Sequence, residues 1–212
     1  RTFIDTYIQY QAKKNERRSK RLGTMTKSLG TMKKQLSQAQ KDLKVDHLSQ
    51  AYNRRSFDEQ LRKYKQLYSL SKGNVSLVIC DIDHFKKIND TYGHLCGDEV
   101  LSKIGALLKD KLSDKSLIGR YGGEEFILAF NSNSLEDVQV LAEEIRELIQ
   151  MTDFNYENQL IKTSISIGAI FYPLDVNHGI DIDRLLAQAD QHLYVSKQNG
   201  RNRVSVSVFK LE

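Results

Sequence analysis

The sequence lacks the features that mark several common protein classes. Its 212 residues include one proline, two cysteines and no tryptophan. Cys80 and Cys96 are too few for a disulfide scaffold, which fits a reducing compartment. With 40% hydrophobic residues and a single proline, the chain is too apolar for a disordered protein. No stretch approaches the roughly 18 apolar residues of a membrane-spanning helix, so the sequence predicts none.

Charge is divided unevenly along the chain. Residues 1–48 carry 12 Lys or Arg and 4 Asp or Glu, a net charge of +8, whereas residues 49–212 carry 20 and 23, a net charge of −3. The total of +5 therefore averages two different segments and does not by itself indicate a nucleic-acid-binding protein. No signal-peptide pattern follows Arg1, and we expect a fragment whose upstream part is missing.

Residues 1–45 contain no proline and predict one long helix. A heptad spacing links seven apolar residues: Leu22, Met25, Leu29, Met32, Leu36, Ala39 and Leu43. Gly23 and Gly30 fall outside this seam, and each costs roughly 1 kcal/mol of helix propensity. Three heptads with methionine and alanine at the d positions predict a marginal parallel coiled coil and hence a homodimer. The alternative is one amphipathic helix that packs on its own domain.

A change of composition near Asp46 predicts a boundary between the helix (residues 1–45) and a globular domain (residues 46–212). In the domain we expect strands over 75–82, 117–121, 124–130, 161–171 and 204–209, and helices over 56–71, from His84, and over 97–111, 134–151 and 182–198. Ser56 and Glu59 have the spacing of a capping box. Because a hairpin interrupts the alternation of strands and helices, the pattern predicts an α+β sandwich, with a mixed central sheet flanked by helices.

Three polar clusters interrupt segments that otherwise resemble a core. Asp81-Ile82-Asp83 ends a buried strand, where two carboxylates and a main-chain carbonyl would suit Mg²⁺ or cap the next helix. In residues 121–126, YGGEEF, two glycines allow a tight turn with positive φ and leave the backbone bare for a phosphate. Glu124 and Glu125 should point to opposite faces of the strand, or form ordinary solvated surface.

The third cluster, KQNGRN, covers residues 197–202 at the end of the last expected helix. Gly200 fits a helix C-cap, and Lys197 and Arg201 suit the negative end of the helix dipole. The alternative is a pair of cations directed at a polyphosphate.

Together these segments identify a family resemblance. The stretches DHLSQAYNRRSF (46–57), DIDHFKKINDTYGHLCGDEVL (81–101), YGGEEF and KQNGRN closely resemble the GGDEF family of diguanylate cyclases, over about residues 44–210. The resemblance implies a palm-like, nucleotidyl-cyclase-like fold. It also implies an enzyme that condenses two GTP molecules into 3′,5′-cyclic di-GMP and releases two pyrophosphates.

The resemblance implies roles for individual residues. Metal ligands would be Asp81, the main-chain carbonyl of Ile82, and Glu124, with Mg²⁺ as the cofactor and Mn²⁺ as a possible substitute. The catalytic candidates are Glu125, Glu124 and Lys86, and Glu125 is our candidate for helping to deprotonate the attacking 3′-hydroxyl, a task that Glu124 or a metal-bound hydroxide could also serve. The substrate-binding candidates are Asn89, Asp98, His94, Phe85, Lys86, Leu48, Lys197 and Arg201.

The binding candidates divide by the part of GTP that they match. An Asp98 carboxylate can accept from the guanine N1–H and N2–H₂, and an Asn89 amide can donate to the acceptors of the base. Leu48 would line the base pocket. Lys86, Lys197 and Arg201 would offset charge on the departing pyrophosphate.

Two stretches depart from the family pattern. The usual LTGL is Leu48-Ser49-Gln50-Ala51, which lies outside the metal and phosphate positions and is not expected to abolish activity. The RxxD site of product inhibition is replaced by Ser113-Asp-Lys-Ser116, with serine at both key positions. We therefore expect no inhibitory site here, and weak or absent feedback by this route.

The implied reaction also predicts partners. One domain would hold one GTP, so two domains must face each other, and the coiled coil would supply that homodimer. We expect an upstream sensory domain to regulate the enzyme through the helix. The basic stretch 13–22 fits the positive-inside rule, which favours a cytoplasmic domain and an inner-membrane anchor upstream of it.

Two other functions compete with this interpretation. One is an inactive receptor for GTP or a cyclic dinucleotide on the same fold, disfavoured because Asp81, Glu124 and Glu125 are all present. The other is a basic-zipper DNA-binding protein, since KKNERRSKRL runs into the heptads. The zipper is short and contains glycine, and the large domain would lack a purpose, so no nucleic-acid partner is expected.

Overall fold

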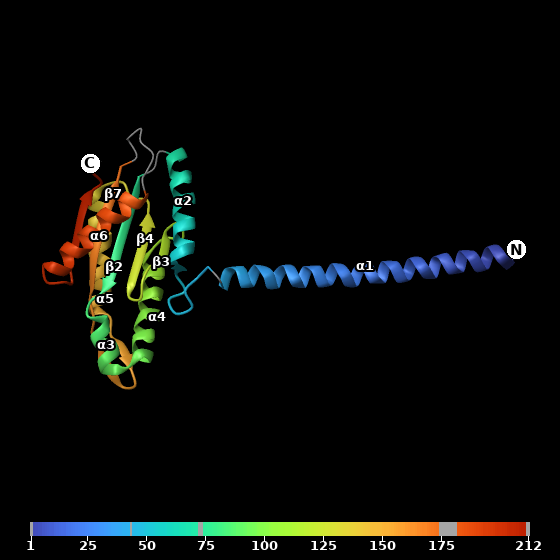
Figure 1. Ribbon diagram of the computed structural model, residues 1–212, viewed down its shortest axis with the longest axis horizontal. Coiled ribbons are helices and arrows are strands. Elements are labelled where there is room, and N and C mark those ends of the chain that lie inside the picture. The colour runs from blue at the N-terminus through green and yellow to red at the C-terminus, as the bar shows by residue number, and fades with distance from the viewer. Residues whose placement is uncertain (1, 43, 72–73, 174–181, 211–212) are drawn as a thin grey trace. The chain divides into compact units, whose positions relative to one another are not determined.

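A computed structural model describes residues 2–42, 44–71, 74–173 and 182–210 (Figure 1). The chain separates into two units, Arg1–Leu43 and Lys44–Glu212, and each is described by itself. None of the described helices is both long and apolar enough to cross a membrane.

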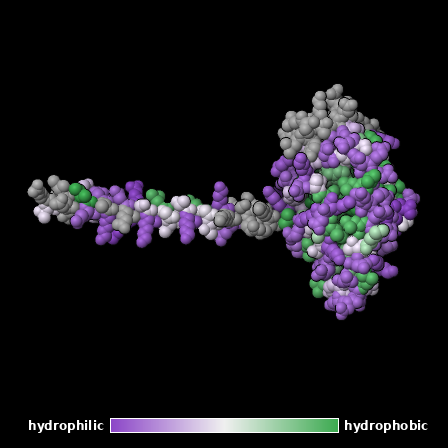
Figure 2. Space-filling model, turned by 180° about the vertical axis from the view of Figure 1, so that it is seen from behind, coloured by the Kyte–Doolittle hydropathy of each residue, from purple (hydrophilic) through white to green (hydrophobic). Residues whose placement is uncertain are grey.

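The first unit is one continuous helix, α1 (Thr2–Asp42), as the sequence predicts. Four residues of the heptad seam are 55–67% exposed on it: Leu22, Met25, Leu29 and Met32. The side chains of Leu36 and Ala39, and all of Leu43, lie outside the described residues. Figure 2 shows separate hydrophobic patches along this mostly hydrophilic helix. The described part of the seam therefore has no partner within its own unit.

The second unit is built on a six-stranded sheet with the strand order β1-β3-β4-β2-β7-β8. Its strands are β1 (Tyr52–Asn53), β2 (Val75–Ile82), β3 (Leu117–Arg120), β4 (Glu125–Phe130), β7 (Ile165–Tyr172) and β8 (Val204–Val208). The pairs β1–β3 and β7–β8 are parallel, and the pairs between them are antiparallel. The predicted mixed sheet is confirmed.

Helices cover both faces of this sheet. α3 (Phe85–Tyr92), α4 (His94–Lys111) and α5 (Leu135–Met151) pack on one face, and α2 (Arg54–Ser71) and α6 (Ile182–Gln198) pack on the other. The central strand β2 sends Val78 and Cys80 into the first core, and Leu77 and Ile79 into the second. Burial on both faces explains its unbroken apolar run, and each large buried side chain contributes roughly 1.5–3 kcal/mol.

One expected strand is wrong. Residues 161–171 divide between β6 (Gln159–Ile161) and β7, and β6 pairs with β5 (Phe154–Tyr156) in a separate two-stranded sheet. The β5–β6 turn is Glu157-Asn158, with φ of 44° and 64°. Turns of this kind normally carry glycine, and its absence hid the hairpin from sequence inspection.

Element boundaries also shift, and α4 begins at His94 rather than at the predicted residue 97. α2 begins at Arg54, before the predicted capping box, because Asn53 Oδ1 accepts from the Ser56 N–H at 3.0 Å and caps the helix. Four residues, 121–124, separate β3 from β4, where a two-residue turn was expected.

Candidate active site

The end of β2 meets the β3–β4 turn. Asp81 lies opposite Glu125 on β4 and opposite Ser166 on β7 in the sheet register. The Ile82 N–H donates to the Glu124 carbonyl oxygen at 3.2 Å, so the turn is fixed beside the last residues of the central strand. Sheet pairing thus brings together two polar clusters that are about 40 positions apart in the sequence.

The carboxylates at this junction repel each other. Burial raises the pKa of Asp81, and the neighbouring charge of Asp83 adds to this effect, while Lys197 and Arg201 oppose it. Burial likewise raises the pKa of Glu124, and the charges of Asp81 and Glu125 raise it further. Each acid therefore carries a destabilised negative charge that a nearby cation would relieve.

Lys197 places a positive charge beside Asp81. Its Nζ lies 2.8 Å from Asp81 Oδ2, and the Asp81 side chain is 7% exposed. The charge of Lys197 also opposes the raised pKa of Glu124. The third polar cluster of the sequence is therefore brought to the first two.

The donor set fits a metal that is shared with a ligand. No group of three or more His, Cys, Asp or Glu side chains suitable for a metal ion occurs in the described part of the chain. Two carboxylates and one main-chain carbonyl would leave coordination positions for phosphate oxygens or water, which is the usual manner of Mg²⁺ binding. Burial and the charge of Asp81 both raise the pKa of Glu124, and two acids placed in this way would suit a divalent cation.

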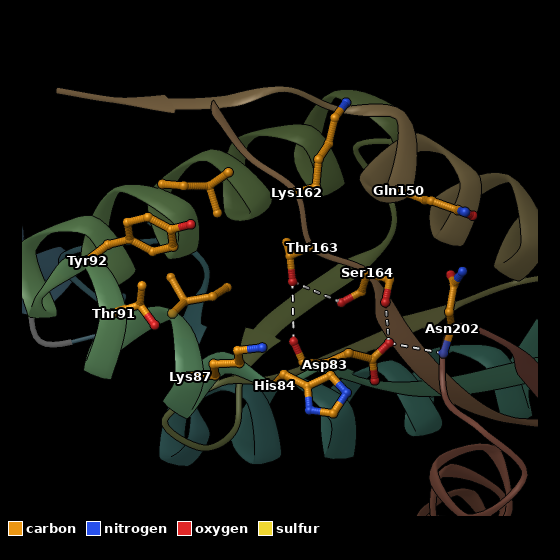
Figure 3. A pocket seen from close by; sticks show the side chains of 12 residues that line it. Asp83, His84, Lys87, Thr91, Tyr92, Gln150, Lys162, Thr163, Ser164 and Asn202 are labelled. Atoms are coloured by element: carbon orange, nitrogen blue, oxygen red, sulfur yellow. Dashed lines mark hydrogen bonds between the residues drawn. The ribbon is translucent and has the colours of Figure 1, made fainter. Parts of the chain in front are cut away.

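Asp83 has a different task from Asp81. Its carboxylate accepts from Ser164 Oγ at 2.6 Å and from the Asn202 N–H at 3.0 Å (Figure 3). It also accepts from Ser166 Oγ at 2.6 Å. These three hydrogen bonds hold the Asp83 carboxylate against Ser164, Ser166 and Asn202. Asp81, by contrast, pairs with Lys197 at the acidic site. Sequence inspection could not separate the two.

The two glycines of the turn differ in their surroundings, and neither is required for its φ angle. Neither Gly122 nor Gly123 adopts a positive φ, so that part of the expectation is wrong. A Cβ on Gly122 would overlap the Glu125 carboxylate. A Cβ on Gly123 would meet no atom within 4 Å, so the backbone here lies open to a bound group.

Arg120 holds the turn in place, a role that sequence inspection missed. Its Nη2 and Nε donate to the Gly123 carbonyl oxygen at 2.6 and 3.2 Å. Its Nη1 lies 3.0 Å from both carboxylate oxygens of Asp46, where the domain begins. Burial alone would raise the pKa of Asp46, but hydrogen bonds from Ser49 and Arg120 lower it overall. Only the arginine immediately before YGGEEF could have hinted at this link.

Arg201 follows α6 and is the second cation whose charge acts on the acidic cluster. The Arg201 N–H donates to the Ser196 carbonyl oxygen at 3.0 Å, and Gly200 has a φ of 107°, so the expected glycine cap is present. The charge of Arg201 lowers the pKa of Asp81 against the effect of burial. The cap and the polyphosphate interpretation are therefore compatible.

The guanine candidates lie on two adjacent helices. Asn89 is on α3 and Asp98 on α4, and a Cβ added at Gly97 would overlap the Asn89 amide and approach the Phe85 ring. Leu48 packs, partly buried, against the core on this face.

Other predicted residues are less constrained. Lys86 and His94 are exposed, and neither side chain forms a hydrogen bond or ion pair within the described part of the chain. Ser113 Oγ and Ser116 Oγ lie 3.1 Å apart and hydrogen-bond to each other across the turn before β3.

A separate cavity of about 670 Å³ has Asp83 in its lining (Figure 3). It is bounded by α3, by the segment 161–164, and by Asn202. None of the substrate or metal candidates lines it, so it is distinct from the acidic site.

The comparisons with known proteins agree on one family. The profile described as "Diguanylate cyclase, GGDEF domain" matches residues 43–203. Diguanylate cyclase A of Treponema denticola is 41% identical over 136 residues, which is 64% of this chain and 36% of that protein. The probable diguanylate cyclase DgcF of Escherichia coli K12 is 37% identical over 167 residues, 76% and 50% of the two chains. This chain thus spans about a third to a half of the length of these relatives.

Solved structures show the same fold. The coiled coil and GGDEF domain of DgcB from Caulobacter crescentus, in complex with c-di-GMP, matches with a TM-score of 0.81 at 28% identity, over 88% of this chain and 97% of that one. The active GGEEF domain of a diguanylate cyclase from Vibrio cholerae matches with a TM-score of 0.64 at 34% identity, over 76% and 98%.

Proposed function

Since this chain belongs to the GGDEF family of diguanylate cyclases, we propose that it condenses two GTP molecules into 3′,5′-cyclic di-GMP and releases two pyrophosphates. The observation that supports the proposal is that three separate segments bring Asp81, Glu124 and Lys197 close enough for their charges to interact. An inactive receptor would not need a repelling carboxylate pair beside a cation. Paired acids that can bind a metal and a nearby ammonium group suit phosphoryl transfer, because negative charge on the attacking and the leaving oxygen must be stabilised.

The metal-binding assignment follows from the donor chemistry. The carboxylates of Asp81 and Glu124 and the Ile82 carbonyl would hold Mg²⁺, or Mn²⁺ in its place. When bound, the ion lowers the pKa of the attacking hydroxyl and neutralises phosphate charge. Glu125 is the proposed acceptor of the 3′-hydroxyl proton, because its strand position opposite Asp81 places it at the same edge of the sheet.

The chain's own cations and amides would orient the nucleotide. Lys197 and Arg201 would bind the terminal phosphates, and Phe85 and Lys86 would face the phosphates from the start of α3. Asn89 and Asp98 would recognise the guanine edge, Leu48 would line the base pocket, and His94 would lie close to the nucleotide. The open backbone at Gly123 supports a close approach of the phosphates to the turn.

Catalysis would need two copies of the chain. Each domain would bring one GTP, and the exposed seam of α1 would join them as a homodimer. A solved relative, DgcB, is described with a coiled coil, and another, SiaD from Pseudomonas aeruginosa, in complex with its activator SiaC. We propose that an upstream sensory segment acts through α1 and that the domain is cytoplasmic, with any membrane anchor upstream of it.

The test is product analysis after incubation with GTP and Mg²⁺. Cyclic di-GMP and pyrophosphate are expected from the native chain, and neither from Glu125→Ala. Binding of GTP without any pyrophosphate would instead identify an inactive receptor. Salt-sensitive, sequence-specific binding to a DNA duplex would favour the basic-zipper alternative.

A further inference from the structure

The segment after α6 has an unusual backbone. Gly200, Arg201 and Asn202 follow one another with φ of 107°, 62° and 47°. Residues other than glycine rarely adopt this conformation, and they keep it only where surrounding contacts impose it. The position of the Arg201 guanidinium therefore depends on the contacts that keep the neighbouring residues, above all Asn202, in this conformation.

Asp83 supplies the first of these contacts (Figure 3). Its Oδ2 accepts from the Asn202 N–H at 3.0 Å and from Ser164 Oγ at 2.6 Å, and its Oδ1 accepts from Ser166 Oγ at 2.6 Å. Asp83 is 4% exposed, so this carboxylate has little access to water as an alternative partner. One carboxylate thus joins the end of β2, two residues after Asp81, to the residue that follows Arg201.

Arg146 on α5 supplies the second contact. Its Nη1 donates to Asn202 Oδ1 at 3.0 Å and to Gln150 Oε1 at 2.7 Å, while its Nε donates to Glu143 Oε2 at 2.6 Å. The Arg146 side chain is 14% exposed. Because Glu143 and Gln150 lie on the same helix, the guanidinium is oriented before it reaches Asn202. Asn202 is therefore held through its backbone by Asp83 and through its side chain by Arg146.

We propose that Arg146 and Asp83 are positioning residues that hold Asn202, and through it direct Arg201 toward the site of the terminal phosphates. Among the described residues, neither side chain forms a hydrogen bond or ion pair with Asp81, Glu124 or Lys197, although the charge of Asp83 raises the pKa of Asp81. Their effect reaches the nucleotide through Arg201, whose charge acts on Asp81. This inference rests on the proposed function, and it adds a set of residues that sequence patterns did not assign.

The experiment measures nucleotide affinity in the native chain and in Arg146→Ala. The probes are 3′-deoxy-GTP, which binds as GTP does but has no attacking hydroxyl, and GMP, which lacks the terminal phosphates. Arg146→Ala should weaken 3′-deoxy-GTP binding about tenfold and leave GMP binding unchanged. The KM for GTP should rise by a similar factor, with a smaller change in kcat, and Arg146→Lys should recover part of the loss.

Two further variants separate positioning from general stability. Asn202→Ala removes the acceptor of the Arg146 bond without deleting a charge, and it should reproduce the effect if Arg146→Ala does not fold. Glu144→Ala is the matched control, since Glu144 is on the same helix but pairs with Lys111 at 2.9 Å, and its nucleotide affinities should equal those of the native chain.

A double-mutant cycle gives the decisive result. In an Arg201→Ala background, adding Arg146→Ala should cause no further loss of 3′-deoxy-GTP affinity, because the effect passes through Arg201. Equal losses for 3′-deoxy-GTP and GMP, full additivity with Arg201→Ala, or no loss at all would each overturn the inference. A native chain that binds GTP but forms no product would overturn the proposed catalysis alone, because the affinity comparison still stands.

Discussion

The pair between Asp46 and Arg120 offers a direct test of how the domain start is joined to the catalytic turn. The two side chains are 17% and 14% exposed, and Arg120 Nη1 lies 3.0 Å from each carboxylate oxygen. Removing one partner of a buried ion pair costs about 3–5 kcal/mol, because the other charge is left buried. Since both side chains keep some exposure, Arg120→Ala should cost about 3 kcal/mol. For a chain of this length, that corresponds to a fall in Tm of roughly 6–12 °C.

Urea unfolding followed by circular dichroism measures this loss. The control is Asp153→Ala, which removes the exposed pair between Lys162 and Asp153, whose side chains are 53% and 55% exposed. Exposed pairs contribute about 0–1 kcal/mol, so the control should change the free energy of unfolding by less than about 0.5 kcal/mol. A double-mutant cycle with Asp46→Ala then isolates the coupling between Asp46 and Arg120.

The stability contributed by the pair between Asp46 and Arg120 should depend on pH. The pKa of Asp46 is lowered in the folded chain from an ordinary value of 3.8. A carboxylate of this kind stabilises the fold above its unfolded pKa, and the contribution disappears as the pH falls through the folded pKa. The gap between the native chain and Arg120→Ala should therefore be complete at pH 7 and should shrink below about pH 4. A coupling energy near zero, or a gap that persists in acid, would refute the assigned role of the pair.

Three other predictions address the site and the helix. Lys197→Met should raise the KM for GTP at least tenfold in a steady-state assay, since a charge-assisted hydrogen bond contributes about 1.5–3 kcal/mol, and an unchanged KM would remove Lys197 from phosphate binding. Cyclic di-GMP should inhibit the native chain weakly in the same assay, and the paired changes Ser113→Arg and Ser116→Asp should strengthen that inhibition, whereas tight inhibition that disappears when either serine is replaced would contradict the expectation. If α1 joins two chains as proposed, the native chain should be a dimer in light scattering and Leu29→Asp should be a monomer, whereas a dimer that withstands this change would place the interface elsewhere.

Much of the fold could be predicted because its signals lie in neighbouring residues. The heptad spacing predicts α1, and the apolar run of residues 75–82 predicts a strand buried on both faces. The packing of Val78 and Leu77 into opposite cores confirms that strand. The β5–β6 hairpin was not predicted, because its turn, Glu157-Asn158, adopts positive φ without glycine. The two-residue strand β1 was too short to leave a periodic pattern.

The candidate site divides in the same way. Its three polar clusters stand out locally, because charged side chains interrupt segments that otherwise form a core. The hydrogen bonds that link distant segments cannot be seen locally, because they join residues far apart in the chain. Asp83 binds Asn202 across 119 positions, and Arg120 binds Asp46 across 74. No local pattern contains such pairings.

By itself, the sequence determined the family, the α+β class, the long helix and the types of residue available for chemistry. Only the tertiary structure decided what each of those residues does. Asp81 and Asp83 have the same side chain two positions apart, yet Asp81 faces Lys197 whereas Asp83 is occupied by two serines and a backbone N–H. The physical reason is that the charge, hydrogen bonding and burial of a carboxylate depend on its neighbours in space, and the folded sheet brings those neighbours from distant parts of the chain.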